Sequence, residues 1–179
     1  MRKMIRALSL FSAMLLLAAC ADSHQLTKSA GSPTFSLDSS DTIYVSVPRD
    51  GVYGSQRYTG SGMTTAQIIQ GAFLKHVDSV NYGNSTQSRD DAWEAAMEAG
   101  ALYLVYPTIL HWEDRATEWS GKPDRVEVKM QVIDVATNTT EATAIAKGKS
   151  GLATMGGDHP QDLLPDPVNE FVSSLFNAQ

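Results

Sequence analysis

The chain has 179 residues, of which 42% are hydrophobic and 19% are charged. This composition is typical of a globular protein and argues against a disordered one. The length fits one domain that folds without a metal or a disulfide. The formal net charge of −6 becomes −9 if the three basic residues before Cys20 (Arg2, Lys3 and Arg6) are removed. Such an acidic domain binds phosphate backbones poorly, so we expect no nucleic-acid partner.

The first 20 residues have the pattern of a lipoprotein signal peptide. Three basic residues precede the apolar run 7–19. A helix of about 13 residues spans about 20 Å, too short for a bilayer core of about 30 Å. Leu17-Ala18-Ala19-Cys20 matches a lipobox, and Cys20 is the only cysteine. We expect cleavage of residues 1–19, a diacylglycerol thioether on Cys20, and a further acyl chain such as palmitate on the new amine, which together give stable anchoring.

The residues after Cys20 predict the membrane in which the protein is located and a flexible tether. An Asp directly after the cysteine is the usual signal for retention in the inner membrane of enteric-type bacteria, and Ala21 occupies that position here. We therefore expect the outer membrane, facing the periplasm, although the sequence leaves surface exposure open. Residues 20–41 are rich in small and polar residues without apolar periodicity, which predicts a flexible tether of about 25 Å. The globular domain is then 42–179.

The first half of this domain is predicted to alternate strands and helices. A β-rich run that stops at Pro48 predicts a strand over 42–47, and a glycine-rich loop follows over 50–62. A helix is predicted from Thr64 or Thr65, with Phe73 among its last apolar positions. A short strand over 77–82 and a second helix, capped by Ser88 or Asp90 and stopped at Gly100, complete this half.

The second half predicts three successive strands and a final helix. Residues 102–112 form a long apolar strand in which Pro107 indicates a bulge or an edge. Residues 125–135 alternate apolar and charged side chains, a turn with Asn138 in a left-handed conformation follows, and 140–149 is a strand of small residues. The helix 165–176 carries an apolar stripe. The order β-α-β-α-β-β-β-α predicts an α+β two-layer sandwich with an antiparallel C-terminal meander and helices on one face.

Motifs for catalysis or metal binding are not found in the sequence. The four histidines lack the spacing of a metal site, and the chain has no nucleophile elbow and no nucleotide-binding fingerprint. We expect neither a metal nor a cofactor, and no enzymatic activity. Gly60-Ser61-Gly62 before a helix could hold a phosphate, but no lysine lies near this turn, and an ordinary loop is the simpler interpretation.

Two clusters are candidate binding surfaces. The first surrounds the turn between strands 102–112 and 125–135 and offers Trp112, Arg115 and Trp119, residue types that concentrate at protein interfaces. Its carboxylates, Glu113 and Asp114 among them, allow a glycan-hydrolase alternative, and a purely structural hairpin is the third reading. The second cluster comprises Tyr53, Arg57 and Tyr58 in the glycine-rich loop, which could recognise a ligand or cover it as a lid, or could simply pack on the sheet.

These segments carry a resemblance to a known family. Asp50-Gly51-Val52-Tyr53-Gly54-Ser55, the Gly-Ser-Gly turn with its Thr-led helix, and the run from Trp112 to Arg125 resemble the bacterial lipoprotein family of domain of unknown function 4823. The likeness covers 42–176 and implies no functional residues, because the family has no assigned activity. More loosely, Ala96-x-x-x-Gly100-Ala101-x-Tyr103 before a long strand is similar to periplasmic domains of curli-secretion lipoproteins and of lipoprotein activators of penicillin-binding proteins.

These patterns favour a membrane-anchored envelope lipoprotein with a non-enzymatic binding or assembly-accessory domain. Its expected partner is another envelope protein or a peptidoglycan-associated component. Two alternatives stay open, namely an envelope hydrolase that uses carboxylates between Trp112 and Asp124, and a small-ligand binder with 50–62 as its lid.

Overall fold

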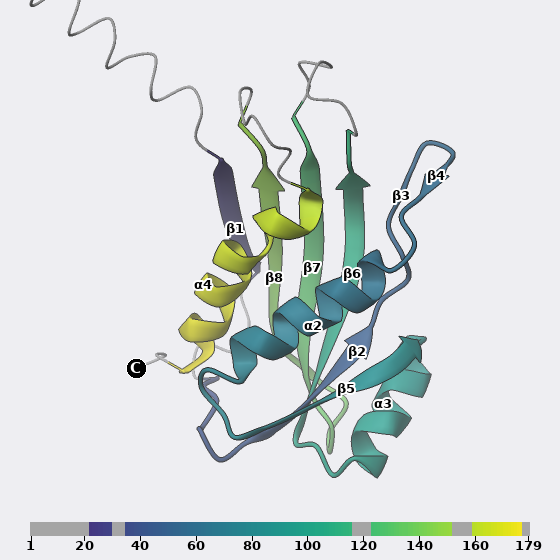
Figure 1. The fold of residues 1–179 in the computed structure, drawn as a ribbon. Coiled ribbons are helices and arrows are strands. Elements are labelled where there is room, and N and C mark those ends of the chain that lie inside the picture. The colour runs from purple at the N-terminus through teal and green to yellow at the C-terminus, as the bar shows by residue number, and fades with distance from the viewer. Residues whose placement is uncertain (1–21, 30–34, 116–122, 152–158, 177–179) are drawn as a thin grey trace, which may run out of the picture.

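The computed structural model describes residues 22–29, 35–115, 123–151 and 159–176 (Figure 1). Within them, a six-stranded sheet has the order β1-β8-β7-β6-β2-β5. In chain order its strands are β1 (Ser23–Ser29), β2 (Thr42–Val47), β5 (Ser79–Thr86), β6 (Tyr103–Glu113), β7 (Arg125–Asp134) and β8 (Thr140–Lys149). The other elements are the hairpin strands β3 (Val52–Tyr53) and β4 (Gln56–Arg57), the helices α2 (Ser61–Phe73), α3 (Arg89–Glu98) and α4 (Pro165–Phe176), and the short 3₁₀ helix η2 (Pro160–Leu163).

The topology confirms the predicted α+β class and the antiparallel meander of β6, β7 and β8. β2 lies between β6 and β5 and pairs in parallel with both. A parallel pair needs a crossover connection, and α2 provides the one between β2 and β5. The sheet is therefore parallel at one edge and antiparallel over the rest of its width.

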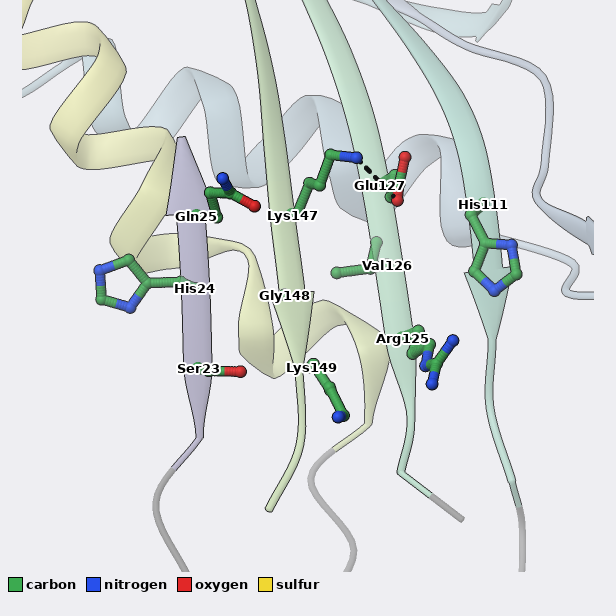
Figure 2. Close-up of a pocket in the computed structure, with 10 residues that line it drawn as sticks. All are labelled: Ser23, His24, Gln25, His111, Arg125, Val126, Glu127, Lys147, Gly148 and Lys149. Carbon is green, nitrogen blue, oxygen red and sulfur yellow. Dashed lines mark hydrogen bonds and ion pairs between the residues drawn. The ribbon is translucent and has the colours of Figure 1, made fainter. Parts of the chain in front are cut away.

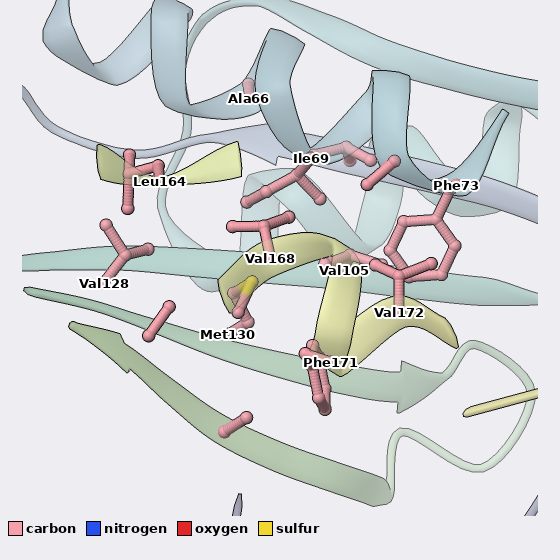
Figure 3. Packing of buried hydrophobic residues seen from close by; sticks show 14 of the residues in the cluster. Ala66, Ile69, Phe73, Val105, Val128, Met130, Leu164, Val168, Phe171 and Val172 are labelled. Atoms are coloured by element: carbon pink, nitrogen blue, oxygen red, sulfur yellow. The ribbon is translucent and has the colours of Figure 1, made fainter. Parts of the chain in front are cut away.

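Successive side chains of the central strands enter two separate cores. Val45 belongs to the main core, which α2 and α4 cover and to which Phe73 and Phe171 contribute (Figure 3). Tyr44, the preceding residue, packs instead with Ala92 of α3 on the other face. Because strand side chains alternate between faces, the two helical layers lie on opposite sides. The prediction that helices cover one face holds for α2 and α4, whereas α3 covers a smaller apolar patch on the opposite face.

The helix ends follow from local backbone chemistry. α2 begins at Ser61, earlier than the predicted Thr64 or Thr65. Its preceding residue Gly60 has a φ of 91°, and the Asp50 carboxylate accepts hydrogen bonds from the N–H groups of Gly60 and Gly62 at 3.1 and 3.0 Å. The predicted Ser88 cap of α3 is confirmed, with a reciprocal capping box to Asp91.

The bounds of β5 differ from the prediction, whereas the position of Pro107 in β6 agrees with it. β5 runs from Ser79 to Thr86, later than the predicted 77–82. Pro107 lies buried in β6, beyond the residues that pair with β2, so β6 is locally an edge at this point, as predicted. The proline is tolerated there because the ladder to β2 ends at Val105, so its missing N–H falls where β2 no longer pairs. The register shift in β6 occurs at Leu110, between Ile109 and His111.

The segment predicted to be a flexible tether contains the edge strand β1. Seven residues pair antiparallel with β8, from Ser23 opposite Lys149 to Ser29 opposite Thr143. The folded domain also includes Leu37, which is buried and donates its N–H to the Leu175 carbonyl at 2.8 Å. The domain therefore begins well before residue 42. Within the described residues, none of the helices combines the length and hydrophobicity needed to cross a bilayer.

Candidate functional site

Tyr53 and Arg115, predicted from separate segments, meet at one end of the sheet. The hairpin of β3 and β4 brings Tyr53 against the end of β6, where its ring packs edge-on against His111 with the ring centroids 5.3 Å apart. The Arg115 guanidinium lies 5.8 Å from the centre of the Tyr53 ring and donates to its hydroxyl at 3.4 Å. The tyrosine is still 42% exposed, so it is accessible to a partner.

Beneath this pair lies the carboxylate of Glu113, which is only 4% exposed. It forms an ion pair with Arg115 and contacts His111 Nε2 at 3.1 Å. Burial by itself raises the pKa of Glu113, but the hydrogen bonds from His111, Tyr53 and Arg115 together hold that pKa below its usual value of 4.5. The carboxylate is therefore ionised and fully engaged near neutral pH.

A second buried acid, Asp124, links the strands on the other side of the turn. Its carboxylate accepts the backbone N–H of Arg115 at 2.5 Å, and its own N–H donates to the Ser150 hydroxyl at 2.9 Å. Burial is the main reason that the pKa of Asp124 is raised. Asp114 in turn contacts His159 Nδ1 at 3.3 Å, which attaches the N-cap residue of η2 to the end of β6. The carboxylates of Glu113, Asp114 and Asp124 thus each bond a neighbouring segment of the chain. Because these contacts occupy the carboxylates, the arrangement argues against the hydrolase alternative.

The other predicted site residues are not part of the contact between Tyr53 and Arg115. The Tyr58 hydroxyl bonds the backbone of Asp114 at 3.3 Å, so this tyrosine packs down on the sheet. Trp112 is 3% exposed and sits so close to Gly51 that a methyl group there would clash with it. Arg57 is exposed in β4, opposite Val52 of β3. Trp119 lies outside the described residues.

The turn at Gly60-Ser61-Gly62 has a structural explanation. Its backbone N–H groups already bond the Asp50 carboxylate, and the Ser61 hydroxyl accepts the N–H of Gly51 at 2.8 Å. A phosphate at this helix end would compete with a resident carboxylate. This geometry favours the ordinary loop over the phosphate-binding interpretation.

A shallow concavity on the sheet was not anticipated from the sequence. It lies on the open face, defined here as the sheet face opposite α2 and α4, and has a volume of about 640 Å³ (Figure 2). Its charged residues are Arg125, Glu127, Lys147 and Lys149. Lys147 and Glu127 form an ion pair at 3.1 Å. We call it the sheet-end concavity, because its residues lie where β1 and β7 begin and β8 ends.

The alternation in β7 and β8 already placed these charges on one face, but only the register brings them together. Arg125 lies opposite Lys149, and Lys149 lies opposite Ser23 of β1. Neither Tyr53 nor Tyr58 lines this concavity. Across the described parts of the chain, no cluster of His, Cys, Asp and Glu is arranged to hold a metal ion.

The chain forms an α+β domain built on one six-stranded sheet. At one end of this sheet, hydrogen bonds and ion pairs of Glu113 and Asp124 join neighbouring segments, and the adjacent concavity carries more cations than anions. The family model described as "Domain of unknown function (DUF4823)" matches residues 35–175, so the chain belongs to that family, as its sequence motifs indicated. No curated protein matches the sequence.

Solved structures share the fold at low sequence identity. A PelC dodecamer from Paraburkholderia phytofirmans is similar with a TM-score of 0.67 and 14% identity, over 88% of this chain and 100% of that chain. Protein XCC0632 from Xanthomonas campestris is similar with a TM-score of 0.50 and 11% identity, over 82% of this chain and 89% of that chain. At these identities the likeness establishes a common fold.

The Glu113 cluster predicts a pH-dependent stability. A lowered pKa in the folded state adds stability above the unfolded pKa, near 4.5, and this stability is lost as the pH falls through the folded pKa. We expect Glu113→Gln to lower the free energy of unfolding by about 1–3 kcal/mol at pH 7, because it leaves Arg115 without its buried partner. The penalty should shrink below pH 4.5. Urea unfolding of both proteins across this range measures it.

Glu127→Gln is the matched control. It also removes one carboxylate from an ion pair on the same sheet, but that pair is more than a third exposed on each side. Its cost should therefore be about 0–1 kcal/mol. A Glu113→Gln penalty of equal size at pH 7 and pH 3 would show that the charge of Glu113 contributes nothing.

Proposed function

We propose that the protein is a lipid-anchored envelope lipoprotein whose domain serves as a non-enzymatic assembly module. The observation that carries the proposal is the lipobox ending in Cys20, directly followed by a folded domain that starts at β1. A single cysteine at a signal-peptide cleavage point is explained by lipidation. Ala21 in the position after the cysteine supports the outer membrane, with the domain facing the periplasm.

The assembly role draws on the fold and on the polar cluster. The acids around the turn are committed to bonds between segments, which suits a rigid scaffold better than proton transfer. The fold likeness also extends over the full length of the chain in the PelC dodecamer. We infer self-association as the first mode of assembly, with another envelope protein or a peptidoglycan-associated component as the further partner.

Metabolic labelling tests the anchor. In cells fed radioactive palmitate, the wild-type protein should carry label and sediment with outer membranes, while Cys20→Ser should be unlabelled, because no other cysteine can form the thioether. Ala21→Asp is the matched control, since it should keep the label but move the protein to the inner membrane. Label on Cys20→Ser equal to that on the wild type would refute the anchor.

Mass measurement tests the assembly. The protein extracted in mild detergent should have a mass several times that of its protomer at the concentrated end of a dilution series, as measured by light scattering corrected for bound detergent. Dissociation at low concentration is expected for a closed homo-oligomer of moderate affinity. A protomer mass at every concentration, up to that in the membrane, would contradict self-association while leaving the anchor intact.

A further inference from the structure

The sheet-end concavity is built from two rows of side chains that the strand register fixes. In the outer row, Ser23 of β1, Lys149 of β8 and Arg125 of β7 lie directly opposite one another. Directly opposed residues in antiparallel strands project from the same face. The inner row contains Gln25, Lys147 and Glu127 in the same way. Figure 2 shows both rows on the open face, with the outer row toward the strand ends.

The outer row holds two cations opposite each other, and the acid opposite Arg125 on its other side, Glu113 of β6, is already paired with Arg115. Arg125 and Lys149 are both exposed, and neither forms an ion pair with any carboxylate in the described residues. Like charges facing each other across a strand pair are destabilising by a few tenths to about 1 kcal/mol. An anion placed between them would remove this repulsion. The nearest acid of the inner row, Glu127, is already paired with Lys147.

The position of this row relative to the anchor suggests which anion is available. Ser23, the first residue of β1, is three residues after Cys20. Three residues span at most about 10 Å. If Cys20 carries lipid, as the proposed function holds, the outer row is therefore held within reach of the phospholipid headgroups. A guanidinium and an ammonium group are the side chains that bind phosphate oxygens most strongly.

We propose that the sheet-end concavity binds the phosphate headgroups of anionic membrane lipids through Arg125 and Lys149. This contact orients the domain, with the first residues of β1 and β7 and the last residues of β8 toward the bilayer and the opposite end of the sheet toward the periplasm. The chain after Cys20 has a negative net charge, so its attraction to an anionic membrane has to come from a local group of cations such as this one. The inference rests on the proposed lipid anchor for its geometry.

Vesicle binding tests the headgroup contact without the anchor. The chain from Ala21 onward contains every described strand and helix but no cysteine, so the result does not depend on lipidation. We expect this chain to bind vesicles containing phosphatidylglycerol and to bind pure phosphatidylcholine vesicles weakly. The Arg125→Gln/Lys149→Gln variant should lose about 25-fold in affinity, from about fivefold for each cation near an anionic surface. Binding should also weaken as salt is raised.

Lys75→Gln/Arg89→Gln is the matched control, because it removes the same charge from positions outside the concavity. Lys75 bonds Asn169 of α4, and Arg89 bonds Asn138 in the turn between β7 and β8. This control should bind as the wild type does. Equal binding to both vesicle types, or equal loss in both double variants, would overturn the proposal. Full competition by millimolar inorganic phosphate would also overturn it, because the site would then be one for free phosphate.

Discussion

The antiparallel ladder between β1 and β8 is the interaction on which the rest of this structure depends. It attaches the segment just after Cys20, the proposed site of lipidation, to the sheet, so Cys20 and the folded domain are separated by only a few residues. Without it, residues 20–41 would be a long tether and the domain could take any orientation. With it, a lipid anchor on Cys20, as proposed above, would fix which end of the sheet lies nearest the membrane.

The same end of the sheet is stiffened by polar contacts in addition to the hydrophobic core, which reaches it through Trp112 and Val126. Glu113 joins the hairpin, through Tyr53, to the end of β6, and Asp124 joins the start of β7 to Ser150 after β8. Buried acids of this kind are costly unless each is hydrogen-bonded, and here each is. This network holds the strand ends in register, and the register places Arg125 and Lys149 opposite each other. The same polar network thus stabilises this end of the sheet and keeps the two cations of the concavity in place.

The sequence predicted correctly those elements in which one type of side chain repeats at a regular spacing. β8 was placed at its observed bounds because small residues, Ala142, Ala144 and Ala146, recur at every second position, and the left-handed Asn138 was identified from its turn. β1 was missed because it is an edge strand held mainly by backbone bonds. Leu26 is its one hydrophobic residue against the core, too weak a signal for a strand.

The candidate site was predicted in part, for a related reason. Tyr53 and Arg115 were chosen by residue type, and the hairpin does bring them together. Trp112 was chosen on the same grounds but points into the core, since the bulge at Leu110 sets the phase of the last residues of β6. The sheet-end concavity depends on the register of three strands, one of which was unrecognised, so no local pattern could indicate it.

Hydrogen exchange at β1 in the detergent-extracted protein tests this account most directly. In an antiparallel edge strand, every second amide bonds its neighbour. We expect alternate amides between Ser23 and Ser29 to exchange far more slowly than those of an unstructured peptide, as their partners in β8 do. Unprotected exchange at every amide of this segment, with β8 still protected, would show that β1 is a tether and would remove the basis for a fixed orientation at the membrane.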